Sequence, residues 1–90
     1  MRVTQRDLEI LTARLNAATN SPKEYSTKDE NGKFSSNIGH YTLSGAYGGW
    51  ELQRVVNNGG AVEVISSGGH VPKRELYGQL CALVRFAEDN

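Results

Sequence analysis

The spacing of the apolar residues changes twice along this chain of 90 residues, and that change constrains the fold more than any other feature. Near both ends the apolar side chains recur every three or four residues, which is the period of one helix face. In the middle they alternate with other side chains, which is the period of a strand. The helical stripes consist of Leu8, Leu11, Leu15 and Ala18 and of Leu76, Leu80, Leu83, Val84 and Ala87. Two amphipathic helices are therefore predicted to flank a region of strands.

The residues near the helix ends define the extent of the two helices. Thr4 can cap the first helix, Asp7 can complete an acidic variant of the capping box, and Val3 can pack on Leu8. Poor helix formers accumulate ahead of Pro22, so this helix is predicted over about residues 4–18. Pro72 suits the opening turn of the second helix, which is predicted over about residues 72–88.

Three segments in the middle of the chain have the period of strands, at about residues 40–46, 50–56 and 61–66. Glycine pairs separate them, because glycine accepts positive φ in tight turns without a steric cost. Short turns predict an antiparallel meander, so the order of elements is α-β-β-β-α. The fold class is α+β, with two helices packed on one face of a three-stranded antiparallel sheet in a single domain of residues 1–90. The other face of the sheet is left to solvent or to a partner.

Residues 20–39 form a polar connection that is unusually long for a compact domain. It is rich in Ser, Asn, Lys and Gly and offers only three sizeable apolar side chains to a core. The segment is therefore predicted to be a loop, either mobile or functional. Alternatively, the Asn31-Gly32 step closes a small hairpin that brings Tyr25 toward Phe34.

The charge of the chain and its single cysteine limit the classes of partner and compartment. Ten basic and ten acidic residues leave no net charge to attract the whole protein to nucleic acid or to an anionic membrane. Cys81 cannot form an internal disulfide bond, which favours a reducing compartment. No apolar stretch approaches the length of a membrane span. We expect a soluble cytoplasmic protein without a membrane partner.

The start of the second helix is the first candidate site, because Lys73 and Arg74 lie where the helix dipole favours acidic residues. A bound phosphate or carboxylate would reverse this disadvantage, and Gly68 and Gly69 provide a flexible entry to the same turn. Gly69 and His70 are therefore counted with Lys73 and Arg74 as candidate ligand-binding residues. The alternative is that both cations are solvated or pair with Glu75 or Glu51, in which case the unfavourable dipole interaction is screened at the surface.

Aromatic residues around a Gly-Gly turn form the second part of the candidate site. Tyr47 and Trp50 flank the turn, and Arg54 lies on the same face of its strand as Trp50. Aromatic faces stack on nucleobases and cations hold phosphates, so the combination favours a nucleotide-like ligand or a single-stranded nucleic acid. The alternative for Trp50 is a core anchor beside Leu52. Tyr47, as a turn residue, is expected to be more exposed.

Residues for catalysis or for metal binding are sparse. His40 and His70 are the only histidines, and the sequence contains no HxxxH or CxxC pair. Cys81 lies on a helix flank near the predicted core, where a thiol is usually inert. We therefore expect no catalytic residue, no metal and no cofactor, and a protein that is not an enzyme.

The order of elements is similar to that of the double-stranded-RNA-binding domain. In that family the start of the last helix carries a run of lysines that contacts phosphates, and PKRE at residues 72–75 offers two basic residues here. The similarity is one of layout and not of motif. It implies a nucleic-acid-binding module as the alternative function.

The stretches YTLSGAYGGWELQRVVNNGG and GGHVPKRELYGQLCALVRF resemble a group of small proteins encoded by tailed phages and bacterial prophages. The resemblance rests on the GAYGG turn and the KREL helix and covers most of the chain apart from the connection between the first helix and the sheet. Gly78 departs from the group's usual longer polar residue.

This resemblance implies the cytoplasm of a bacterial host during infection or lysogeny. It also implies an accessory protein that acts by stoichiometric binding of a small anionic ligand or a host protein. A host protein would be expected on an apolar patch of the open sheet face, around Tyr41, Leu43 and Leu52, and the same face would allow a homodimer.

Overall fold

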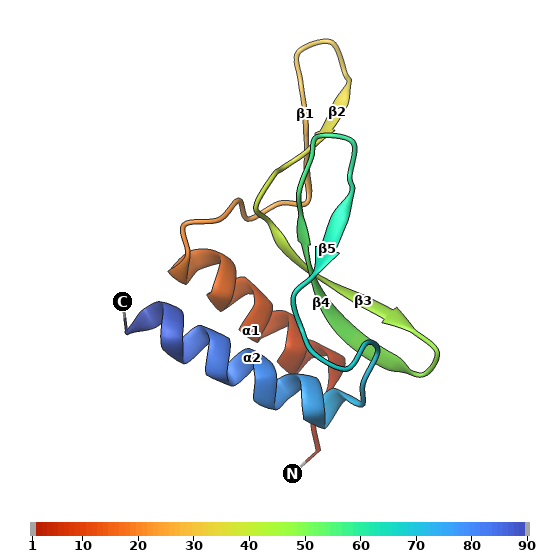
Figure 1. Cartoon of the computed structure of the whole chain (residues 1–90). Helices are drawn as coiled ribbons and strands as arrows, with labels where there is room; N and C mark the ends of the chain where they lie inside the picture. The colour runs from red at the N-terminus through yellow and green to blue at the C-terminus, as the bar shows by residue number, and fades with distance from the viewer. Residues whose placement is uncertain (1, 90) are drawn as a thin grey trace.

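A computed structural model of the chain describes residues 2–89 and confirms the α+β class. Figure 1 shows two helices packed beside a twisted antiparallel sheet, with a second, smaller hairpin projecting away from both. The elements are α1 (Gln5–Ala18), β1 (Ser26–Lys28), β2 (Phe34–Ser36), β3 (Tyr41–Ala46), β4 (Gly49–Val55), β5 (Val62–Val64) and α2 (Lys73–Glu88).

Helix α1 begins at the predicted capping box. The Thr4 hydroxyl accepts a hydrogen bond from the Asp7 amide at 3.2 Å, and the Thr4 amide donates to the Asp7 carboxylate at 2.9 Å. These two bonds satisfy amides that would otherwise have no partner in the first helical turn. Helix α2 lacks such a device, since Pro72 precedes it and offers no side-chain cap.

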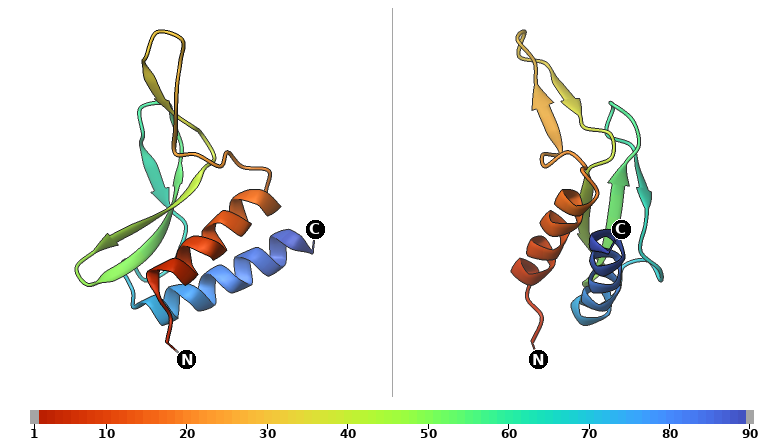
Figure 2. Two further views of the ribbon diagram at one scale, coloured as in Figure 1. Left: turned by 180° about the vertical axis from the view of Figure 1, so that it is seen from behind. Right: turned by 90° about the vertical axis from the view of Figure 1, so that its left-hand side faces the viewer.

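The main sheet has the strand order β3-β4-β5, and both helices cover one of its faces (Figure 2). The helices lie side by side and run in the same direction (Figure 1). Apolar side chains from both helices meet those of β4 and of the segment before α2. The core consists of Leu8, Leu11, Leu15, Leu52, Val71, Leu76, Leu80 and Val84. None of the helices within residues 2–89 is long and apolar enough to cross a membrane.

Of the two alternatives for residues 20–39, the hairpin closed near Asn31-Gly32 is confirmed and the loop is wrong, because β1 and β2 form an antiparallel hairpin there. The Asp29 carboxylate closes the tip by accepting hydrogen bonds from the amides of Asn31 and Lys33, both at 2.9 Å. Tyr25, however, does not turn toward Phe34. Its hydroxyl donates instead to the carbonyl of Gly60 at 3.2 Å, which joins the hairpin to the β4–β5 turn.

The apolar patch expected around Tyr41, Leu43 and Leu52 does not lie on the open face of the sheet. Leu52 is completely buried in the core, and the other two side chains pack against that core from β3. The three share a face because Leu43 pairs with Leu52 across the strands, and the helices cover that face. The face away from the helices, called the open face here, carries the opposite set of β3 and β4 side chains, which are Thr42, Ser44, Ala46, Glu51, Gln53 and Val55. Glu51 and Val55 are nevertheless buried.

Candidate functional site

The turn between β3 and β4 consists of Tyr47 and Gly48, both at positive φ, of 54° and 73°. Ala46 pairs with Gly49 at its base, so it is a two-residue hairpin loop in which both central residues adopt the left-handed region. Glycine accepts this conformation readily, but a tyrosine does so at a cost. The Tyr47 side chain is nevertheless 97% exposed. The turn therefore presents an aromatic side chain that neither the backbone nor the core requires.

Trp50 combines the two roles that the sequence left open. Its indole lies over Gly45, where an added Cβ would come within 3.1 Å of the ring. The side chain is half-buried and packs against the core from the edge. The backbone of Trp50 also exchanges two hydrogen bonds with Val71, at 2.8 and 2.9 Å. Trp50 therefore anchors the segment before α2 and leaves part of its ring exposed.

The segment that leads into α2 is held against the sheet at several points. The Ser66 hydroxyl accepts a hydrogen bond from the Leu52 amide at 2.9 Å, and the Gln79 side chain bonds to both the amide and the carbonyl of Ser67. A Cβ on Gly49 would come within 2.8 Å of the His70 backbone, so a glycine is needed where the turn and this segment cross. These contacts fix the start of α2 beside the β3–β4 turn.

His70 lies on the open face of the sheet, next to two polar side chains. Its Nε2 is 3.4 Å from the Ser44 hydroxyl and 3.6 Å from Oε1 of Glu51. The Glu51 side chain is only 8% exposed, and its carboxylate also accepts a hydrogen bond from Gln53 at 2.8 Å. Ser44 and Glu51 were not predicted from the sequence as partners of His70. Their mutual pairing across the turn was the one available signal.

The same imidazole contacts Tyr47 from the other side. The two rings meet edge to face, with centroids 5.7 Å apart. Ser44 and Glu51 both approach Nε2, so they do not form the relay of a catalytic triad, in which the acid and the nucleophile contact different ring nitrogens. The arrangement instead ties the exposed tyrosine to the sheet.

An open groove of about 600 Å³ runs between the β3–β4 turn and the start of α2. Gly45, Gly49 and Trp50 line one side, and Pro72 and Lys73 line the other. Lys73 is the first residue of α2, and Arg74 follows it in the same exposed turn. The groove thus combines an aromatic ring, glycine backbone and a cation at the positive end of a helix dipole.

Of the residues that the sequence singled out, Trp50 and Lys73 line this groove. Tyr47 and His70 contact each other at the adjoining turn, outside the groove lining. Gly69 and Arg74 are sequence neighbours of His70 and Lys73, and Arg54 is not brought to this end of the sheet. Arg54 lies over the ring of Tyr41, 5.4 Å from its centroid, at the opposite end of the β3–β4 pair. Placing it in the site was wrong. It shares a face with Trp50, but four residues along a strand span about 13 Å.

Cys81 lies outside this groove, on the flank of α2 one turn beyond Tyr77. The nearby thiol raises the pKa of the Tyr77 hydroxyl, through its charge and through a hydrogen bond to the phenol. Within residues 2–89, no group of three or more His, Cys, Asp or Glu side chains is placed to hold a metal ion.

Comparisons of this chain with protein-family models, with curated proteins and with solved structures found no match.

Proposed function

We propose that this protein binds a small anionic ligand of nucleotide type, stoichiometrically and without catalysis, in the groove between the β3–β4 turn and the start of α2. The proposal rests on the backbone conformation and the exposure of Tyr47. Its backbone has an unfavourable positive φ of 54°, and its ring is 97% exposed. Strain of this kind persists where the surrounding structure compensates for it, and it concentrates at ligand-binding sites.

The groove offers complementary contacts to the two halves of such a ligand. A nucleobase can stack on the exposed part of the Trp50 ring in the groove, or on the ring of Tyr47 at the adjoining turn, which lies outside the groove lining. The phosphate can lie at the start of α2, where Lys73 and the positive end of the helix dipole favour negative charge. The buried Glu51 carboxylate is directed to His70 on the open face and does not line this groove.

The proposal extends to the biological setting that the sequence resemblance implies. A small accessory protein of a phage or prophage would act in the bacterial cytoplasm by holding a signalling nucleotide away from the host. Binding alone is sufficient for that role, because a protein produced in excess over the ligand lowers its free concentration.

Isothermal titration calorimetry with a panel of mononucleotides and cyclic nucleotides tests the proposal. We expect saturable binding of at least one compound at one site per chain, and a loss of about tenfold or more for Lys73→Glu, because one charge-assisted contact is replaced by repulsion. Tyr47→Ala should weaken binding through lost stacking, by about tenfold.

Two variants serve as controls for these substitutions. Lys28→Glu makes the same charge change on the β1–β2 hairpin, and Arg54→Gln removes the cation that lies at the far end of the strands. Both should retain the affinity of the wild-type protein. The proposal is wrong if no compound of the panel binds, or if Lys28→Glu weakens binding as much as Lys73→Glu does.

A nucleic acid is the second candidate ligand. It is favoured because the exposed β3–β4 turn lies beside the start of α2, and both helices lie on one face of the sheet. With two phosphate contacts, a plot of the logarithm of the association constant against the logarithm of the salt concentration would have a slope of about −2. Retention on duplex RNA with such a slope, together with no nucleotide binding, would favour this alternative.

A further inference from the structure

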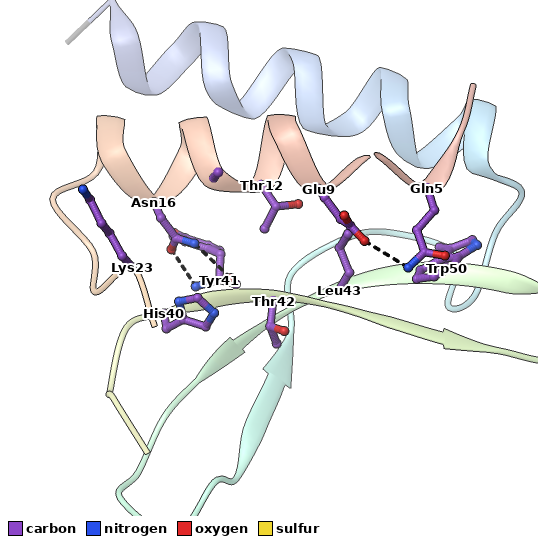
Figure 3. A pocket seen from close by; sticks show the side chains of 11 residues that line it. Gln5, Glu9, Thr12, Asn16, Lys23, His40, Tyr41, Thr42, Leu43 and Trp50 are labelled. Atoms are coloured by element: carbon purple, nitrogen blue, oxygen red, sulfur yellow. Dashed lines mark hydrogen bonds between the residues drawn. The ribbon is translucent and has the colours of Figure 1, made fainter. Parts of the chain in front are cut away.

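A second groove, of about 360 Å³, lies between α1 and the outer edge of β3 (Figure 3). Figure 3 shows the side chains of Gln5, Glu9 and Asn16 pointing from the helix toward the strand. Leu43 and Trp50 form the apolar part of the wall, and Ala13 leaves space on the helix side. This groove meets the one beside the β3–β4 turn only at Trp50.

The edge of β3 in this groove is already paired at one end by a side chain. The Asn16 amide group accepts a hydrogen bond from the Tyr41 N–H at 2.8 Å and donates one to the Tyr41 carbonyl at 3.1 Å. A residue of a neighbouring strand would make the same two bonds to Tyr41. Asn16, which is 4% exposed, therefore imitates a fourth strand at its first position.

Farther along β3 the same edge is open. Backbone groups alternate in direction along a strand, so the N–H and C=O of Leu43 and Gly45 point to the same side as those of Tyr41. Within residues 2–89 no protein group pairs with them there, since β4 lies on the other side and α1 offers no further amide to β3. Unpaired strand groups beside an apolar wall are the features that bind extended peptides by strand addition.

We propose that an extended peptide segment of a partner protein adds to β3 as a fourth strand, opposite Leu43 and Gly45 and beneath α1. Alternate side chains of the peptide would pack on Leu43 and Trp50. The charges in the groove define the peptide further. Figure 3 shows Glu9 midway along the helix side, where its carboxylate accepts a hydrogen bond from Gln5 at 3.0 Å, and Lys23 at the end near His40. The peptide therefore carries a basic residue facing Glu9 and an acidic residue toward Lys23.

A second copy of this chain fits the same edge less well. The copy would present its own β3, YTLSGA at residues 41–46, and that strand contains no basic residue to face Glu9. A symmetric pair would also bring the two Glu9 carboxylates toward one interface. Charge complementarity thus favours a peptide of another protein over self-association.

The proposal can be tested with a library of random linear peptides selected on the immobilised full-length protein. We expect selected peptides to combine a basic residue with strand-forming residues, and to shift or protect the backbone amides of Leu43 and Gly45 in NMR spectra. N-methylation of alternate peptide nitrogens should weaken binding by about tenfold, and methylation of the nitrogens between them should not, because only every second amide faces β3.

A matched pair of variants locates the peptide on the protein. Ala13→Phe fills the groove from an exposed position of α1, and it should weaken binding by about tenfold or more. Ala17→Phe makes the same change on an exposed part of α1 outside the groove, and it should leave the affinity unchanged. Circular dichroism of both variants confirms that the fold is retained.

Three results would overturn the proposal. The first is that no selected peptide binds, and the second is that binding persists in Ala13→Phe or shows no alternation on N-methylation. The third is a concentration-dependent dimer that protects Leu43 and Gly45 without any peptide, because the edge would then belong to a second copy. None of these results bears on nucleotide binding, which is measured separately with Lys73→Glu.

Discussion

Replacing Tyr47 by asparagine should stabilise the fold while it weakens ligand binding. A left-handed backbone costs an L-residue about 1–2 kcal/mol, and asparagine tolerates it better than most side chains. The substitution also removes the edge-to-face contact with His70, at a ring separation of 5.7 Å. That contact contributes about 0.5 kcal/mol, at the low end for aromatic pairs, because Tyr47 is 97% exposed. The net gain in the free energy of unfolding is then at most about 0.5–1.5 kcal/mol, the value if asparagine removes the whole left-handed cost.

Tyr47→Ala is the matched control, because alanine lacks the ring but still pays the left-handed cost. It should therefore lose about 0.5 kcal/mol relative to the wild type. Urea denaturation with linear extrapolation measures all three proteins, and equal m-values confirm that only stability has changed. If Tyr47→Asn is no more stable than Tyr47→Ala, the turn is not strained at this residue, and the main support for the proposed site is lost.

The remaining predictions concern positions away from the turn. Gly78→Ala should raise the free energy of unfolding by about 1 kcal/mol, since this exposed mid-helix glycine has open space around it; lower stability in thermal denaturation would contradict this. Asn16→Ala should cost about 2–3 kcal/mol in urea denaturation, because it leaves both backbone groups of Tyr41 without a partner. Cys81→Ala should lower the pKa of Tyr77 toward its ordinary value, since the thiol is the largest cause of the raised pKa; an unchanged titration of phenolate absorbance, compared with Tyr77→Phe, would refute that cause.

The sequence predicted the elements whose signals are local. The Thr4–Asp7 capping box and the apolar stripes of both helices depend on spacings of three or four residues. The β3–β4 turn depends on the glycines beside Tyr47, and its paired strands follow directly on either side. In each of these places the short-range pattern and the tertiary contacts agree, so no long-range information was required.

The β1–β2 hairpin was harder to predict because its strands have only three residues each and no apolar alternation. Its stability comes from the turn at Asp29 and from distant contacts, such as the bond from Tyr25 to Gly60. The alternation of side chains along the strands was enough to predict that Leu43 and Leu52 share one face of the sheet. Which face the helices cover is a tertiary outcome, and it was predicted wrongly.

The sequence predicted only part of the candidate site, because the contacts that assemble it are also tertiary. Tyr47, His70 and Lys73 come together because the backbone of Trp50 pairs with that of Val71, a contact between residues 21 positions apart in the chain. No pattern in the sequence indicates that pairing. Arg54 was misplaced because strand periodicity reports the face of a residue and not its distance along the strand.

The most direct test of the central claim is a two-dimensional NMR titration of the wild-type protein and of Lys73→Glu with the nucleotide panel. We expect saturable chemical-shift changes for Tyr47, the Trp50 indole and the first turn of α2 in the wild-type protein, and their loss in Lys73→Glu. The proposed site is wrong if no nucleotide changes the spectrum, or if saturable shifts appear at other residues and persist in Lys73→Glu.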